Sequence, residues 1–236
     1  CKLQIGGSDQ WGNIVAGLDL IRKVEGGSAH ALTVPLLAKS DGSKFGKTAS
    51  GAIWLDATMT SAYEFFQFWL NSDDADMPKL LKVFSMKDRK EIERLIETVN
   101  TNPGAREAHR ELAREMTTLI HGADMAKKVE EAAKALFGQG EISELDLATL
   151  DSALSQLPKT QVKKGEDFPT WVDLLAATGV VDSKSAARRI VKEGGAYLNN
   201  KKVESEDFTP SKSDLLHGKY LLLRKGKRDL AAVEVV

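Results

Sequence analysis

Two short polar strings in the first fifty residues combine side chains that could do chemistry. The first, QIGGSDQWGN at residues 4–13, places two glycines after an apolar stretch and then amide and carboxylate side chains. If a strand ends there and a helix follows, the string lies at the ligand-binding end of an open α/β sheet. Glycines let a ligand approach the main chain, and a helix start offers free amide hydrogens to an anion. Asp9 could accept hydrogen bonds from ribose hydroxyls, and Gln4 and Gln10 could bind a polar substrate group.

The same string also has a purely structural interpretation. An acidic residue such as Asp9 is favoured in the first turn of a helix by the helix dipole, and Gly6 and Gly7 could simply form a tight turn. The nucleotide fingerprint GxGxxG is absent from the string. Spacing alone therefore leaves both interpretations open, and Trp11 fits a core position better than a stacking position.

The second string is GSKFGKT at residues 42–48. It is one residue short of a phosphate-binding P-loop, because Asp41 stands where that motif needs its first glycine. The residues after Thr48 also lack the helical face that follows a P-loop. We interpret the string as a flexible loop in which Lys44 and Lys47 close over a triphosphate and neutralise charge as a phosphate leaves. The alternative is a solvated basic loop.

The elements that would position both strings make up a small α/β segment. The pattern predicts a strand at residues 2–5, a helix from Ser8 and a buried strand at residues 32–37. One strand, one helix and a further strand cannot close a doubly wound sheet. We therefore expect residues 1–55 to be the α/β remnant of a larger domain, and the chain to be the rear part of a longer protein.

The rest of the chain divides into a helical segment and a small mixed segment. Residues 56–158 predict helices throughout, beginning with an aromatic helix at residues 63–70 that is apolar nearly all round and is expected in the core. The polar residues 159–167 predict a linker. Residues 168–236 predict two short helices followed by a small sheet, an α+β module.

Composition excludes several classes of protein. The 236 residues are 42% hydrophobic and 28% charged, which excludes a disordered or collagen-like chain. No apolar run reaches the roughly 18 residues that span a bilayer, so we expect a cytoplasmic protein with no membrane partner. Cys1 is the single cysteine and the four histidines are scattered, so we expect no metal held by the protein.

The formal net charge of −1 hides an uneven distribution. Residues 1–55 carry net +2, residues 56–167 net −6 and residues 168–236 net +3. In the last segment Lys184, Arg188 and Lys192 fall four apart on one face of a predicted helix, with Arg189 beside them. Such a stripe fits the phosphates of structured RNA, and a solvated surface stripe is the alternative.

Taken together, QIGGSDQWGN, LTVPLL at residues 32–37 and KFGKT at residues 44–48 resemble the second half of bacterial tyrosyl-tRNA synthetases, and the resemblance covers the whole chain. KFGKT is similar to the class I signature usually written KMSKS. The resemblance implies a Rossmann-like catalytic remnant in residues 1–55 and an all-α anticodon-binding domain in residues 56–158. After the linker at 159–167, it implies a small α+β RNA-binding domain of the ribosomal-protein S-four type in residues 168–236.

The resemblance also implies roles for residues of the first string. Gln4 and Gln10 match glutamines that line the tyrosine pocket, while Gly7 and Asp9 match positions that hold the adenosine ribose of ATP.

In the second string, Lys44, Lys47 and Thr48 match the mobile catalytic loop that stabilises departing pyrophosphate, and Lys47 is the position most expected to bind ATP. Phe45 and Gly46 replace the Met and Ser of the signature.

The implied function is ATP-dependent activation of tyrosine and its transfer to tRNA(Tyr), with Mg²⁺ bound to ATP, by a full-length enzyme expected to be a homodimer. Lys184, Arg188, Arg189 and Lys192 are expected to bind RNA. The HIGH-type motif has no counterpart here, so we expect the 236-residue chain alone not to aminoacylate. A noncatalytic RNA-binding protein derived from a synthetase and a tryptophanyl-tRNA synthetase are the alternatives.

Overall fold

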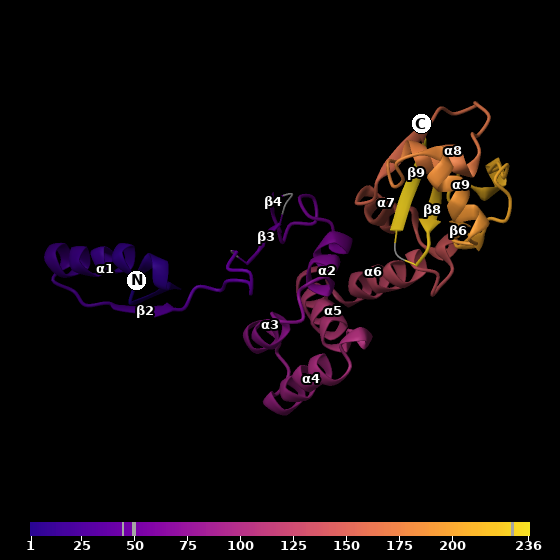
Figure 1. Ribbon diagram of the computed structural model, residues 1–236. Helices are drawn as coiled ribbons and strands as arrows, with labels where there is room; N and C mark the ends of the chain where they lie inside the picture. The colour runs from indigo at the N-terminus through magenta and orange to yellow at the C-terminus, as the bar shows by residue number, and fades with distance from the viewer. Residues whose placement is uncertain (44, 49–50, 228) are drawn as a thin grey trace. The chain divides into compact units, whose positions relative to one another are not determined.

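The computed structural model describes residues 1–43, 45–48, 51–227 and 229–236 (Figure 1). The chain forms two compact units, Cys1–Ala52 and Ile53–Val236. The first unit ends three residues before the predicted limit at 55, and the second holds both the helical segment and the C-terminal α+β module.

The first unit is a strand–helix–strand arrangement, as the sequence predicts, but the second strand lies at His30–Val34 rather than at residues 32–37. The expectation that this strand is buried is wrong, because Leu32 and Val34 are exposed. The elements of this unit are β1 (Leu3–Gly7), a 3-10 turn (Ser8–Gln10), α1 (Trp11–Leu20), a π turn (Ile21–Glu25) and β2 (His30–Val34). The two strands are parallel, with Leu3 opposite His30 and Gly7 opposite Val34. The short strands β3 (Lys47–Thr48) and β4 (Gly51–Ala52) form an antiparallel pair.

The glycine pair of the first string does not form the tight turn that its sequence suggests. Gly6 and Gly7 are the last two residues of β1 and pair with Thr33 and Val34. Gly7 has extended backbone angles, φ −70° and ψ 158°. The parallel ladder therefore continues through both glycines, and the chain turns only at the 3-10 residues that follow.

The helical part of the second unit consists of α2 (Ala62–Leu70), α3 (Met77–Phe84), α4 (Arg89–Thr101), α5 (Glu107–His121), α6 (Ala123–Leu136) and α7 (Leu147–Ser155). The aromatic helix α2 is buried, as predicted, because its rings meet rings of neighbouring helices. Phe65 packs edge to face on His121, and Trp69 packs the same way on Phe84. Its N-terminus is fixed by a capping box.

The C-terminal module contains β5 (Lys159–Val162), α8 (Trp171–Ala177), α9 (Lys184–Lys192), β6 (Ala196–Leu198), β7 (Lys201–Lys202), β8 (Tyr220–Lys225) and β9 (Asp229–Val235). The five strands form a mixed sheet in the order β5-β9-β8-β6-β7, in which β5 runs parallel to β9 and the other pairs are antiparallel. Helices α8 and α9 pack on this sheet through a shared core that contains Trp171, Leu175, Leu221 and Val233 (Figure 1).

The predicted linker at residues 159–167 is wrong for its first four residues. Lys159–Val162 forms the edge strand β5, paired with Ala232–Val235 of β9. Val162 is buried, and its carbonyl accepts a hydrogen bond from the Val236 amide at 3.0 Å. β5 pairs on one side only, and Val162 is its one buried residue, so its otherwise polar sequence does not indicate a strand.

Candidate functional site

The carboxyl end of β1 carries a connected group of polar side chains. Gln10 Nε2 donates to Asp9 Oδ2 at 3.3 Å, and Asn13 Nδ2 donates to Gln10 Oε1 at 3.1 Å. All three side chains are exposed. The structure thus brings Asp9 and Gln10 together as the sequence suggests, with their donors and acceptors still open to solvent.

The absence of a side chain at Gly7 leaves the space in which the Asp9 carboxylate lies. A Cβ atom on Gly7 would lie 2.6 Å from Asp9 Oδ1, closer than any real contact, whereas Leu36 Cδ1 would be an ordinary 3.6 Å away. The backbone of Gly7 is extended and would accept any residue. The glycine is therefore needed for the carboxylate that lies against it.

Gln4 and Gln10 lie on the same side of β1. The Gln4 Oε1 atom is 3.9 Å from the Cβ position of Gly17 in α1, which places the side chain on the helix-facing side of the strand. Gly6 is two residues further along and faces the same way. Gln10 Cβ is 3.4 Å from the Cβ position of Gly6, so both glutamines border the same face.

The loop before the second string is organised by Asp41. Its Oδ1 atom accepts a hydrogen bond from the Ser43 amide at 2.8 Å. Hydrogen bonds from the Ser43 side chain and from this amide hold the pKa of Asp41 below its ordinary value. The Phe45 amide donates to the Leu37 carbonyl at 3.4 Å and joins the two ends of the loop. The residue that breaks the P-loop pattern is thus the one that holds this turn.

The candidate lysines of this loop are described only in part. Lys44 lies outside the described residues. Lys47 and Thr48 form β3, where they pair with Ala52 and Gly51. Gly46, just before them, has φ +80°, a left-handed conformation that favours glycine. The meeting of Lys47 with Asp9 at one nucleotide stays a prediction.

The basic stripe lies on α9, as predicted, with Lys184, Arg188, Arg189 and Lys192 all exposed. Each of the four has a carboxylate partner. Lys184 Nζ lies 2.7 Å from Asp173, Lys192 Nζ lies 3.3 Å from Glu206, and two longer contacts join Arg188 to Glu206 and Arg189 to Glu193. The Lys184 contact lowers the pKa of Asp173. Three acidic side chains thus offset much of the stripe's charge.

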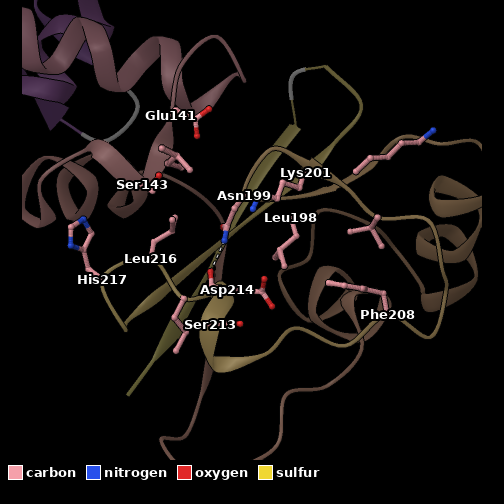
Figure 2. A pocket seen from close by; sticks show the side chains of 14 residues that line it. Glu141, Ser143, Leu198, Asn199, Lys201, Phe208, Ser213, Asp214, Leu216 and His217 are labelled. Carbon is pink, nitrogen blue, oxygen red and sulfur yellow. Dashed lines mark hydrogen bonds between the residues drawn. The ribbon is translucent and has the colours of Figure 1, made fainter.

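Sequence reasoning missed a cavity in the second unit. It has a volume of about 480 Å³ and is lined by Glu141–Ser143, by the β6–β7 hairpin and by residues between Phe208 and His217. Figure 2 shows the hydrogen bond from Asn199 Nδ2 to the Asp214 carbonyl, 2.6 Å long, among these residues. Its walls come from segments far apart in the sequence, so no local pattern indicates it. Asn13 was also missed, although its position three residues after Gln10 is a helical contact distance.

No group of three or more His, Cys, Asp or Glu side chains is arranged to hold a metal ion in the part of the chain that the structure describes. None of the described helices has the length and apolar character needed to cross a membrane.

Comparisons with known proteins identify two regions. Residues 1–138 match the family model described as tRNA synthetases class I (W and Y). Residues 149–233 match the model described as tyrosine–tRNA ligase SYY-like C-terminal domain.

Curated relatives match along the whole chain. The tyrosine–tRNA ligase of Streptomyces avermitilis is 58% identical over 236 residues, which are 100% of this chain and 55% of that protein. The tyrosine–tRNA ligase of Thermobifida fusca is 55% identical over 238 residues, covering 99% of this chain and 55% of that protein. The chain thus spans about half the length of these relatives.

Among solved structures, a C-terminally truncated Aspergillus nidulans mitochondrial tyrosyl-tRNA synthetase matches 58% of this chain and 39% of its own, with 34% identity and a TM-score of 0.49. The assignment rests on the family models and the curated relatives. Because the class I model covers more than half of its residues, this chain belongs to the class I tRNA synthetase family of the tryptophan and tyrosine group.

Proposed function

We propose that this chain is part of a tyrosine–tRNA ligase that activates tyrosine with ATP and transfers it to tRNA(Tyr). The observation that carries the proposal is the order of the two family matches in one chain. A class I (W and Y) region at residues 1–138 is followed by a tyrosine–tRNA ligase-like C-terminal domain at residues 149–233. The second match favours tyrosine over tryptophan.

In the first step, a carboxylate oxygen of tyrosine bonds to the α-phosphorus of ATP, and the bond from that phosphorus to the bridging oxygen breaks as pyrophosphate leaves. The tyrosine carboxylate is already ionised, so the step needs no protein base. Catalysis then rests on positioning and on stabilising the charge that develops. In the second step, a terminal ribose hydroxyl of tRNA attacks the acyl carbon and AMP leaves.

The residues at the end of β1 have the chemistry for the binding part of this reaction. Asp9 offers carboxylate oxygens to the ribose hydroxyls of ATP, and Gly7 leaves the room that this carboxylate occupies. Gln4 and Gln10, on one face of β1, bind polar groups of tyrosine.

The loop residues Lys44, Lys47 and Thr48 stabilise the leaving pyrophosphate, whose charge is shared with the Mg²⁺ that ATP brings as substrate. Two ammonium groups three residues apart suit two phosphates of one triphosphate. The proposal for these residues rests on their sequence and on the resemblance of KFGKT to the class I signature.

The rest of the chain would bind the tRNA. We assign anticodon binding to the helical residues 56–158. We assign RNA-backbone contacts to residues 168–236, an S-four-type module whose basic surface includes Lys184, Arg188, Arg189 and Lys192. Each enzyme molecule would act as one half of a homodimer.

The test is amino-acid-dependent ATP–pyrophosphate exchange by a protein of the relatives' length that contains this chain. Exchange that requires tyrosine and is not supported by tryptophan is the expected result. Exchange with tryptophan instead would make the protein a tryptophanyl-tRNA synthetase. Binding of tRNA without exchange for either amino acid would make it a noncatalytic RNA-binding protein, and both results would overturn the proposal.

A further inference from the structure

The cations of the C-terminal module differ in how far nearby carboxylates neutralise them. On α9, four cations have three carboxylate partners, Asp173, Glu193 and Glu206, each within 4.0 Å. A phosphate that approaches this stripe meets these negative charges along with the positive ones. The stripe therefore attracts a polyanion less strongly than its sequence suggests.

The β6–β7 hairpin presents two lysines in a different setting. Lys201 and Lys202 are exposed, and no carboxylate lies within 4.0 Å of either ammonium group among the residues that the structure describes. Glu141 and Asp214 line the same cavity as the two lysines but lie beyond ion-pair distance. Within the described part of the chain, neither lysine of this pair is thus neutralised by a paired carboxylate, and the Lys202 Nζ atom lies beside Gly194, just after α9.

The turn that carries the lysines is held in place. Asn199 and Asn200 form the two-residue loop between Leu198 and Lys201, and both have left-handed backbone angles, φ 46° and 64°. Asn199 uses both ends of its amide, donating to the Asp214 carbonyl at 2.6 Å and accepting from the Leu222 amide at 2.8 Å.

Asn200 ties the turn to two further elements. Its Nδ2 donates to the Ala135 carbonyl in α6 at 2.6 Å, and its Oδ1 accepts from Arg224 Nε at 3.2 Å. The Arg224 guanidinium in turn lies 3.8 Å from the centre of the Tyr197 ring. Lys201 and Lys202 therefore extend from a fixed turn, and a ligand does not have to order the main chain that carries them.

Their position on the sheet also suits a polyanion. β7 is the end strand of the five-stranded sheet, so one edge of its main chain has no partner among the described strands. Lys201 and Lys202 are both exposed on this edge strand and both line the cavity beside it, so two ammonium groups are available to neighbouring phosphates of one backbone. Lysine side chains and main-chain amides are the usual contacts to nucleic-acid phosphates.

We propose that Lys201 and Lys202 on the β6–β7 hairpin are a phosphate-contacting site of the C-terminal module, with the backbone of structured RNA as the partner. This inference rests on the proposed function, because it names where that module contacts tRNA. Each lysine contributes more to the salt dependence of binding than a lysine that already has a carboxylate partner.

The experiment measures the affinity of the 236-residue chain for a tRNA(Tyr) transcript by fluorescence anisotropy across about 50 to 200 mM salt. Lys201→Ala/Lys202→Ala is compared with Arg22→Ala/Lys23→Ala in the first unit, to which the proposed function assigns no tRNA contact. The control pair is also adjacent and exposed, and both side chains pair with Asp19, at 2.6 Å for Arg22 and 2.5 Å for Lys23. Both variants remove two positive charges.

Each lost phosphate contact lowers the slope of log affinity against log salt by about 0.7 to 0.9. The slope of the hairpin variant is expected to be shallower by about 1.4 to 1.8. The fold-loss in its tRNA affinity across this fourfold salt range is therefore about tenfold smaller than that of the wild type. The control is expected to keep the wild-type slope, and Lys201→Arg/Lys202→Arg should restore it. Unchanged circular dichroism and thermal midpoints show that the fold is retained.

The outcomes separate this inference from the proposed function. If the wild-type chain binds tRNA with a steep salt slope and the hairpin variant keeps that slope, the inference alone is overturned. The two lysines then serve only to keep the edge of the sheet from pairing with another strand. A wild-type chain without salt-dependent tRNA binding overturns the RNA-binding part of the proposed function. If the hairpin variant binds poly-glutamate more weakly than the wild type but binds tRNA equally well, the partner is an acidic protein surface, and the inference is contradicted.

Discussion

Replacing Gly7 by alanine tests whether the carboxylate of Asp9 acts on ATP. The new methyl group would lie 2.6 Å from Asp9 Oδ1 and at ordinary contact distance from Leu36. Because the backbone of Gly7 is extended, alanine itself fits, and the strain is relieved by rotating the exposed side chain of Asp9. That rotation breaks the hydrogen bond from Gln10 and removes the carboxylate from its place.

The expected loss follows from the bonds that Asp9 would make to ribose. A hydrogen bond to a charged group contributes about 1.5 to 3 kcal/mol, and 1.4 kcal/mol corresponds to about tenfold in rate or affinity. Gly7→Ala in a protein of the relatives' length should therefore lower kcat/KM for ATP by about 10-fold to 150-fold in pyrophosphate exchange. Protein stability should change by less than about 0.5 kcal/mol, because the displaced side chain is on the surface.

The matched control is Gly12→Ala in α1, where nothing lies within 4 Å of the Cβ position. Asp9→Ala should reproduce the loss, and the double variant Gly7→Ala/Asp9→Ala should lose no more than Asp9→Ala alone. The reasoning is refuted if kcat/KM for ATP in Gly7→Ala stays within about twofold of the Gly12→Ala value, or if the two losses add.

Three further predictions concern stability. Trp171 is fully buried and its indole N–H donates to a main-chain carbonyl of β6 at 3.1 Å, so Trp171→Ala should lower the free energy of unfolding in urea by about 3 to 5 kcal/mol and Trp171→Phe by less. Ser61 and Glu64 form the capping box of α2, so Ser61→Ala should lower it by about 0.5 to 2 kcal/mol, and no measurable change would contradict that role. Arg114 lowers the pKa of Glu130 from 4.5 to about 2. The stabilisation is therefore complete above about pH 4.5 and lost as the pH falls to about 2, and the stability difference between wild type and Glu130→Gln should narrow over that range.

Local signals in the sequence predict much of this fold. The helices of the second unit follow from apolar periodicity and from capping residues, as at α9, where Ser183 caps the helix by accepting from the Ala186 amide at 3.2 Å. The parallel strand–helix–strand of the first unit follows from its pattern as well. In the helices the decisive contacts join residues close in sequence, and the β1–β2 pairing joins residues 27 apart.

The features that the sequence did not predict have a common physical cause: they depend on contacts between segments that are far apart in the chain. β5 is recognised only by its pairing with β9, about 70 residues later. The charge of the α9 stripe depends on Asp173 and Glu206, which come from other elements. At the candidate site, Asp9 and Gln10 are neighbours in sequence and could be predicted to meet. The proposed meeting of Lys47 with them would be a long-range contact, which local spacing does not determine.

The central claim is that the end of β1 and the KFGKT loop act on one ATP molecule. Tyrosine-dependent ATP–pyrophosphate exchange by Lys47→Ala, in a protein of the relatives' length, tests it most directly. The account predicts an exchange rate lowered by about 10²-fold or more, with tRNA affinity unchanged. An exchange rate equal to that of the wild type would contradict it.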